Sequence, residues 1–135
     1  MRRVTIVIAI CAVLALALTV MGQAPRDITA IMKEVGPLAQ GIGAKVNGGD
    51  NAGVAADAAK LEALFKEAQA FFAKEKISDA EGWSKTAAEA AGKAAKDAKA
   101  GTVDKAAKNL GINCKQCHDA HREKNADGTF KLKRE

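Results

Sequence analysis

The residues best suited to chemistry are two cysteines and two histidines near the C-terminus. Cys114-Lys115-Gln116-Cys117-His118 has the spacing C-x-x-C-H, and His121 follows three residues later. Positions i and i+3 of a helix lie on one face, so two thiols at this spacing can reach both vinyl groups of one porphyrin. The imidazole of His118 then lies under the iron. The pattern predicts one covalently attached haem c with His118 as the proximal iron ligand.

The first 22 residues have the layout of a secretory signal peptide. Two arginines precede an uncharged apolar run from Val4 to Val20, and small residues follow at Gly22 and Ala24. Cleavage after Gly22 is favoured, because cleavage after Ala24 puts Pro25 first in the mature chain. The alternative is an uncleaved anchor, since the run approaches the ~18 residues of a spanning helix. We expect a periplasmic protein that meets the membrane only through this segment if it is uncleaved.

Cleavage also changes the cysteine count and the charge. Cys11 lies in the apolar run and is removed with it, which leaves two cysteines in an oxidising compartment. Loss of the two arginines lowers Lys plus Arg from 21 to 19 against 16 acidic residues, so the formal charge falls from +5 to +3. The basic residues are not interleaved with aromatics, and tyrosine is absent, so nucleic acid is not an expected partner.

Three other uses of the C-terminal cysteines and histidines have weaker support than haem attachment. A C-x-x-C redox pair usually starts a helix after a strand, and no strand is visible here. A zinc site needs about four ligands, and four side chains from a single helix cannot easily surround one ion. A disulfide between Cys114 and Cys117 would strain a helix. Export together with the full C-x-x-C-H motif favours haem.

The mature chain contains four predicted helical stretches and no convincing strand. The first, 26–46, has apolar residues at i, i+3, i+4 and i+7 spacing, and the pair Gly36-Pro37 predicts a kink. The second covers about 52–76, and its predicted buried face consists of Val54, Ala58, Leu61, Leu64, Phe65, Ala68, Phe71 and Phe72. The third begins with the capping-box pattern Ser78-Asp79-Ala80-Glu81 and offers mainly alanine to the core. The fourth follows a break at Gly101-Thr102 and contains the C-x-x-C-H motif.

Amphipathic helices with short links predict an all-α fold, here an antiparallel four-helix bundle with covalently bound haem. We expect the domain at 23–124 and a basic C-terminal tail, ordered only in part, at 125–135. Large side chains are few in this core, and small ones leave room for a flat apolar group. The chain without haem is therefore expected to be loosely packed or unfolded.

A four-helix bundle with C-x-x-C-H near its C-terminus resembles the cytochrome c′ family. The segment 114–122 resembles the family's haem helix, with His121 where members often have tyrosine. Glu81-Gly82-Trp83-Ser84 resembles the start of its third helix, and the segment 31–36 resembles the first helix of its low-spin members. The Gly36-Pro37 pair and the tail after the haem helix depart from the family pattern.

The resemblance implies that the distal side of the iron decides the function. In low-spin members a methionine of the first helix closes the site and the protein transfers electrons. In high-spin members the site is open and small gases such as nitric oxide or carbon monoxide bind. Met32 is the one methionine left after cleavage at Gly22, and it aligns with the low-spin ligand. We therefore expect electron transfer with Met32 as distal ligand; the alternatives are Met32 as core filler and a five-coordinate gas-binding protein.

The same resemblance assigns roles to two further residues and excludes one for His121. Arg122 is the family's basic residue near the haem, where it contacts a propionate or orients His118; otherwise it is a solvated arginine. Trp83 packs near the porphyrin, in the core, or both. His121 follows His118 on one helix and cannot reach the opposite haem face, so it is expected to be exposed or near a propionate.

Catalysis is not expected, because a peroxidase needs a distal acid–base histidine and the chain offers none. The expected partners are redox proteins, met weakly through lysines of the third helix, and small gases if the distal site is open. Antiparallel dimers are common in the resembled family, so the resemblance also implies a homodimer.

Overall fold

The computed structural model describes residues 26–133, so the predicted signal peptide at 1–22, its cleavage sites and Cys11 lie outside the described residues. The described part is mainly helical, as predicted. Its helices are α2 (Ile28–Asn47), α3 (Asn51–Glu75), α4 (Ser78–Lys99), α5 (Val103–Asn109) and α6 (Cys114–His121), and its strands are β1 (Arg122–Lys124) and β2 (Phe130–Leu132). No helix within 26–133 is long and apolar enough to cross a bilayer.

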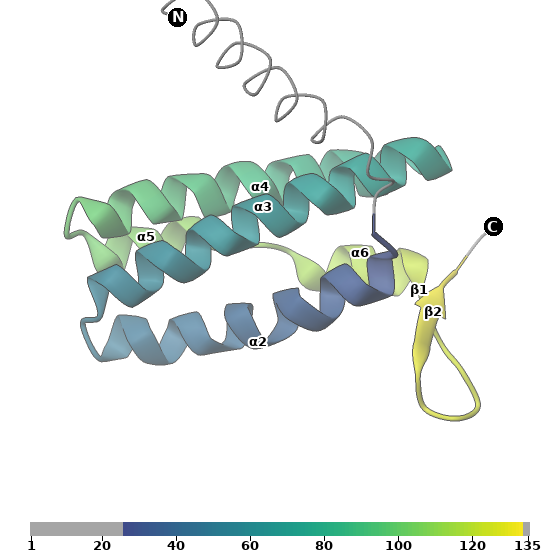
Figure 1. Ribbon diagram of the computed structural model, residues 1–135, viewed down its shortest axis with the longest axis horizontal. Coiled ribbons are helices and arrows are strands. Elements are labelled where there is room, and N and C mark those ends of the chain that lie inside the picture. Colours follow the sequence, from purple (N-terminus) through teal and green to yellow (C-terminus); the bar gives the residue numbers. More distant parts are fainter. Residues whose placement is uncertain (1–25, 134–135) are drawn as a thin grey trace, which may run out of the picture.

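The three long helices run alternately in opposite directions, with α2 packed against α3 and α3 against α4 (Figure 1). Short links enforce this arrangement. Asp27 and Asp50 cap α2 and α3, since their carboxylates accept hydrogen bonds of 2.8 Å from the N–H groups of Thr29 and Gly53. At the other end of α3, Lys76 adopts the left-handed conformation (φ 60°) that reverses the chain toward α4.

The core confirms the predicted apolar faces. Every apolar residue predicted on the buried face of the second helix is buried: Val54, Ala58, Leu61, Leu64, Phe65, Ala68, Phe71 and Phe72. Helix α4 contributes small side chains, mostly alanine, and its Gly92 lies so close to α3 that a Cβ there would be 2.8 Å from the carboxyl carbon of Glu62. Small residues thus let α3 and α4 approach closely.

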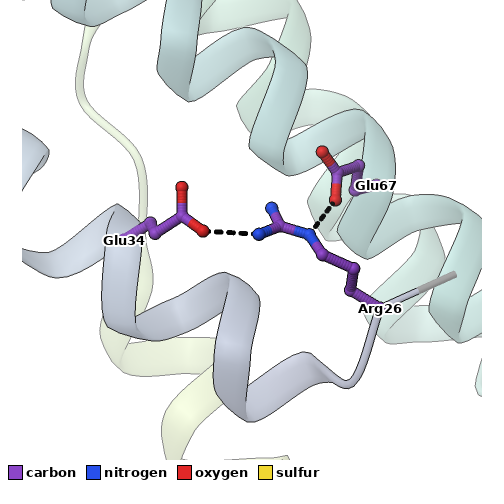
Figure 2. Close-up of polar contacts among 3 residues, drawn as sticks. All are labelled: Arg26, Glu34 and Glu67. Atoms are coloured by element: carbon purple, nitrogen blue, oxygen red, sulfur yellow. Dashed lines mark hydrogen bonds and ion pairs between the residues drawn. The ribbon is translucent and has the colours of Figure 1, made fainter.

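Ion pairs hold α2 against α3 near both ends. Arg26 donates hydrogen bonds to Glu34 on α2, at 2.5 Å, and to Glu67 on α3, at 2.8 Å (Figure 2). Both carboxylates raise the pKa of Arg26, so its guanidinium stays charged. Toward the far end of α2, Lys45 pairs with the carboxylate of Asp57, which is buried on α3. These contacts fix the position of α2, and with it Met32, along α3.

Two helix predictions need correction. The capping box at the start of α4 does not form: the helix begins at Ser78 after Ile77, with no side-chain cap. The fourth predicted helix is divided, because α5 ends at Asn109 and α6 begins at Cys114. Gly111 lies in the break, where its backbone freedom disfavours helix, and the Asn113 side chain starts α6 by accepting the Gln116 N–H.

The segment beyond α6 also differs from expectation. Strands β1 and β2, which the sequence did not predict, pair in antiparallel register with Lys124 opposite Phe130. Gly128 provides the positive φ of 87° in the turn between them. The hairpin includes residue 125, where the sequence predicts the basic tail to begin.

Helix α2 contains Pro37, and the helix continues through this residue.

Candidate functional site

The C-x-x-C-H motif begins at the first residue of α6, which lies with the hairpin at the end of the molecule where α2 and α4 begin (Figure 1). Neither Cys114 nor Cys117 is in a disulfide; Cys114 is exposed, and Cys117 is half-buried against the core. The two cysteines are one helical turn apart, so both thiols belong to one side of α6. That arrangement is the one that two thioether bonds to a single porphyrin require.

His118 follows on the same helix and is half-buried. Burial lowers its pKa, the nearby Arg122 cation lowers it further, and Asp119 partly opposes them. The neutral imidazole is therefore favoured at neutral pH, and neutral imidazole is the form that ligates a metal.

The thiol of Cys117 has a raised pKa, first because of burial and then because of Asp79 and Cys114. Reactive thiolates of redox pairs show the opposite shift. The start of a helix is one feature of such a pair, but the segment before α6 in the described chain is α5 and a loop rather than a strand. The environment of half-buried Cys117 thus favours a protonated thiol over a thiolate nucleophile.

His121 connects α6 to α4. Its Nε2 lies 2.9 Å from Oδ2 of Asp79, its ring centroid lies 5.9 Å from that of Trp83, and its side chain is only 11% exposed. Its backbone carbonyl accepts the N–H of Lys133 at 2.9 Å. The expectation of an exposed His121 was therefore wrong, because the end of α6 packs on the start of α4.

Asp79 is the site residue that the sequence reasoning missed. It belongs to the pattern interpreted as a capping box, whereas its carboxylate accepts the N–H of Ala80 and pairs with His121, 42 residues away. No local spacing signals a contact over that distance. Asp79 also lies close enough to Cys117 to raise the pKa of that thiol, so it belongs to the surroundings of the motif.

The structure places the remaining predicted residues around this end of the molecule. Trp83 is half-buried beside His121, and Arg122 is exposed with its guanidinium 4.2 Å from the ring centroid of Phe130. Met32, in the second turn of α2, is half-buried and packs against the same core as Cys117. Helix α2 also contacts β2 of the hairpin that follows α6.

Two hollows in the described part of the chain lie away from this site. The larger hollow, about 510 Å³, lies at the other end, between the turn joining α2 to α3 and the turn joining α4 to α5. The second is lined by side chains of α3 and α4, and neither includes a predicted site residue. Within 26–133, no three His, Cys, Asp or Glu side chains form a metal-holding group. The donors present, two separate thiols and one neutral imidazole, fit a covalently attached haem.

Comparison of the chain with family models, curated proteins and solved structures finds no match.

Removing the charge of Asp79 tests its pairing with His121. The hydrogen bond from His121 lowers the pKa of Asp79, so the stabilisation is present above the usual carboxylate range and is lost as pH falls through the lowered pKa. We expect Asp79→Asn to reduce the free energy of unfolding by about 0.5 kcal/mol at pH 7, a value discounted because the side chain is 49% exposed.

Urea unfolding followed by far-UV circular dichroism measures this effect between pH 7 and pH 2. The difference between wild type and Asp79→Asn should shrink as the carboxylate is protonated. Glu89→Gln removes a carboxylate from the exposed face of the same helix and should leave the midpoint unchanged. Equal effects of the two substitutions would assign the loss to net charge and contradict a specific pair.

Proposed function

We propose that this chain is an exported electron carrier with one haem c, bound through Cys114 and Cys117 with His118 as proximal ligand. The observation that carries the proposal is the pair of unlinked thiols one turn apart at the start of α6, followed directly by a half-buried imidazole with a lowered pKa. When bound, haem supplies an iron that changes its charge by one electron.

The chain's own residues supply attachment, ligation and positioning. Cys114 and Cys117 fix the porphyrin to α6. His118 offers a neutral ring nitrogen, and the adjacent Arg122 cation disfavours its protonation. The pair of His121 with Asp79 holds α6 on α4, which limits how the ligand can shift between oxidation states. A site that changes little on reduction suits electron transfer.

We further propose Met32 as the distal ligand in a four-helix cytochrome domain similar to the low-spin cytochrome c′ proteins. Two observations support this. The helices α2, α3 and α4 alternate in direction, with α5 and α6 together forming the return segment (Figure 1). Met32 also belongs to the end of α2 that lies at the same end of the molecule as α6, and its side chain is only partly buried against the core.

Optical spectra of the exported, purified protein test the function. Covalent haem should survive denaturation, and the reduced spectrum should be unchanged by carbon monoxide if Met32 occupies the sixth position. A carbon monoxide shift together with a high-spin ferric spectrum would favour the alternative, a gas-binding protein. Absence of covalent haem from protein matured in a host that attaches c-type haem would overturn the proposal.

The chain without haem should be poorly ordered. Helix α4 buries mainly alanine, and the apolar residues Met32, Leu110, Ile112 and Leu132 are only partly covered. We expect the haem-free chain to lose its near-UV circular dichroism and to melt broadly, because apolar burial is incomplete without the cofactor. A cooperative melt at the temperature of the holoprotein would contradict this.

A further inference from the structure

The hairpin that follows α6 carries its charges unevenly on its two faces. Residues alternate between faces along each strand, and the register pairs Arg122 with Leu132 and Lys124 with Phe130. One face therefore carries Arg122, Lys124, Phe130 and Leu132, and the other carries Glu123 opposite Lys131. Leu132 packs against the core, which leaves Arg122, Lys124 and Phe130 exposed; we call these three residues the cationic face.

The cationic face is built around an aromatic ring. Phe130 is 44% exposed, and among residues 26–133 it is the only large apolar side chain that is exposed. The guanidinium of Arg122 lies 4.2 Å from its ring centroid, a cation–π contact that restrains both side chains. Exposed arginine and aromatic side chains are the types enriched where proteins bind one another.

The acidic residues of the hairpin are engaged elsewhere. Glu123, on the opposite face, pairs with Lys131 at 3.5 Å. Asp127, in the turn, accepts hydrogen bonds of 2.9 and 2.6 Å from the backbone and hydroxyl of Thr129. The positive charges of Arg122 and Lys124 are thus not neutralised by a carboxylate on their own face.

The cationic face lies next to the C-x-x-C-H motif of α6. Strand β1 begins at the residue after His121, and Arg122 is close enough to His118 to lower the pKa of that ligand. A partner seated on the face would therefore lie beside the haem attachment residues. Electron transfer needs such proximity, and opposite charge speeds the encounter.

We propose that the cationic face docks an acidic surface of the protein that donates electrons to this chain or accepts them. The proposal rests on the proposed electron-carrier function. A protein partner is favoured over a lipid surface because the face offers one ring and two cations, too little apolar area for a membrane anchor.

Oxidation of the reduced holoprotein by ferricyanide tests the face with an anionic probe. At low ionic strength, Lys124→Glu should slow the reaction about threefold, and the effect should vanish near 0.5 M salt, where screening is strong. Lys105→Glu makes the same charge change at an exposed residue in the first turn of α5, at the far end of the molecule (Figure 1), and should alter the rate much less. Poly-L-glutamate should bind the face and slow wild-type oxidation but not that of Lys124→Glu.

Three other results would contradict the docking face, the protein partner or the electron-carrier function. Equal slowing by Lys124→Glu and Lys105→Glu would show that net charge alone acts and would overturn the docking face. Binding to phosphatidylglycerol vesicles that is lost in Phe130→Ser would overturn the protein partner in favour of a lipid. If wild-type holoprotein fails to react with ferricyanide at all, the electron-carrier function itself fails, and that result is distinct from loss of the charge effect.

Discussion

The double variant Cys114→Ala, Cys117→Ala is expected to contain no covalently bound haem. The two thiols lie one turn apart on α6 and belong to no disulfide, so each is free to form one thioether bond. Each single variant keeps one bond and should retain part of the covalent haem, whereas the double variant keeps none. Haem staining after denaturing electrophoresis, scaled to protein amount, measures the loss.

Cys11→Ala provides the matched control for this experiment. Cys11 lies in the predicted signal peptide, so its replacement should leave the haem content of the mature protein unchanged. Covalent haem in the double variant would contradict the assignment of the motif. Stoichiometric zinc in the wild type, lost in the double variant, would instead support the zinc alternative that C-x-x-C with nearby histidines leaves open.

Much of the fold follows from patterns within single helices. The buried face of α3 was predictable because its large apolar residues recur at helical spacing over 25 residues, and such a face has one way to be buried. The end of α4 was equally clear from Gly101-Thr102. The capping-box pattern marks the correct start of α4 for a wrong reason, since the helix begins at Ser78 with no side-chain cap.

Features that depend on distant contacts could not be predicted in this way. The pairing of Asp79 with His121 spans 42 residues, and no periodicity connects them. The division between α5 and α6 depends on the Asn113 cap competing with continued helix, a difference of about 1 kcal/mol that pattern matching does not resolve. The hairpin has strands of three residues, too short to show alternation.

The candidate site also combines residues that a local pattern identifies with residues from distant parts of the chain. Cys114, Cys117 and His118 lie within five consecutive residues, so their spacing alone predicts the attachment chemistry. Met32 and Trp83 belong to α2 and α4, far from the motif in sequence, and their assignment to the site rests on resemblance. In the structure the ion pairs of Arg26 with Glu34 and Glu67 restrain the first turns of α2, which contain Met32 (Figure 2).

Met32→Leu is expected to convert the ferric holoprotein from low spin to high spin. Leucine has no thioether, so the sulfur-to-iron band near the red end of the spectrum should disappear, and the reduced protein should gain carbon monoxide binding. The fold should survive, since Met32 is half-buried and an exchange of similar volume costs less than about 1.5 kcal/mol. Optical spectra of both oxidation states, with and without carbon monoxide, measure the change.

Leu38→Met is the matched control, because it makes the reverse exchange at another half-buried position of the same helix. It should leave the spin state unchanged, since Leu38 lies nearly two turns from Met32 and Pro37 separates the two. A wild type that is already high-spin, or a Met32→Leu variant with an unchanged spectrum, would show that Met32 does not ligate iron and only packs in the core. The C-x-x-C-H motif would then still hold haem, but with an open distal side, where ligand binding rather than electron transfer becomes the function that the chain supports.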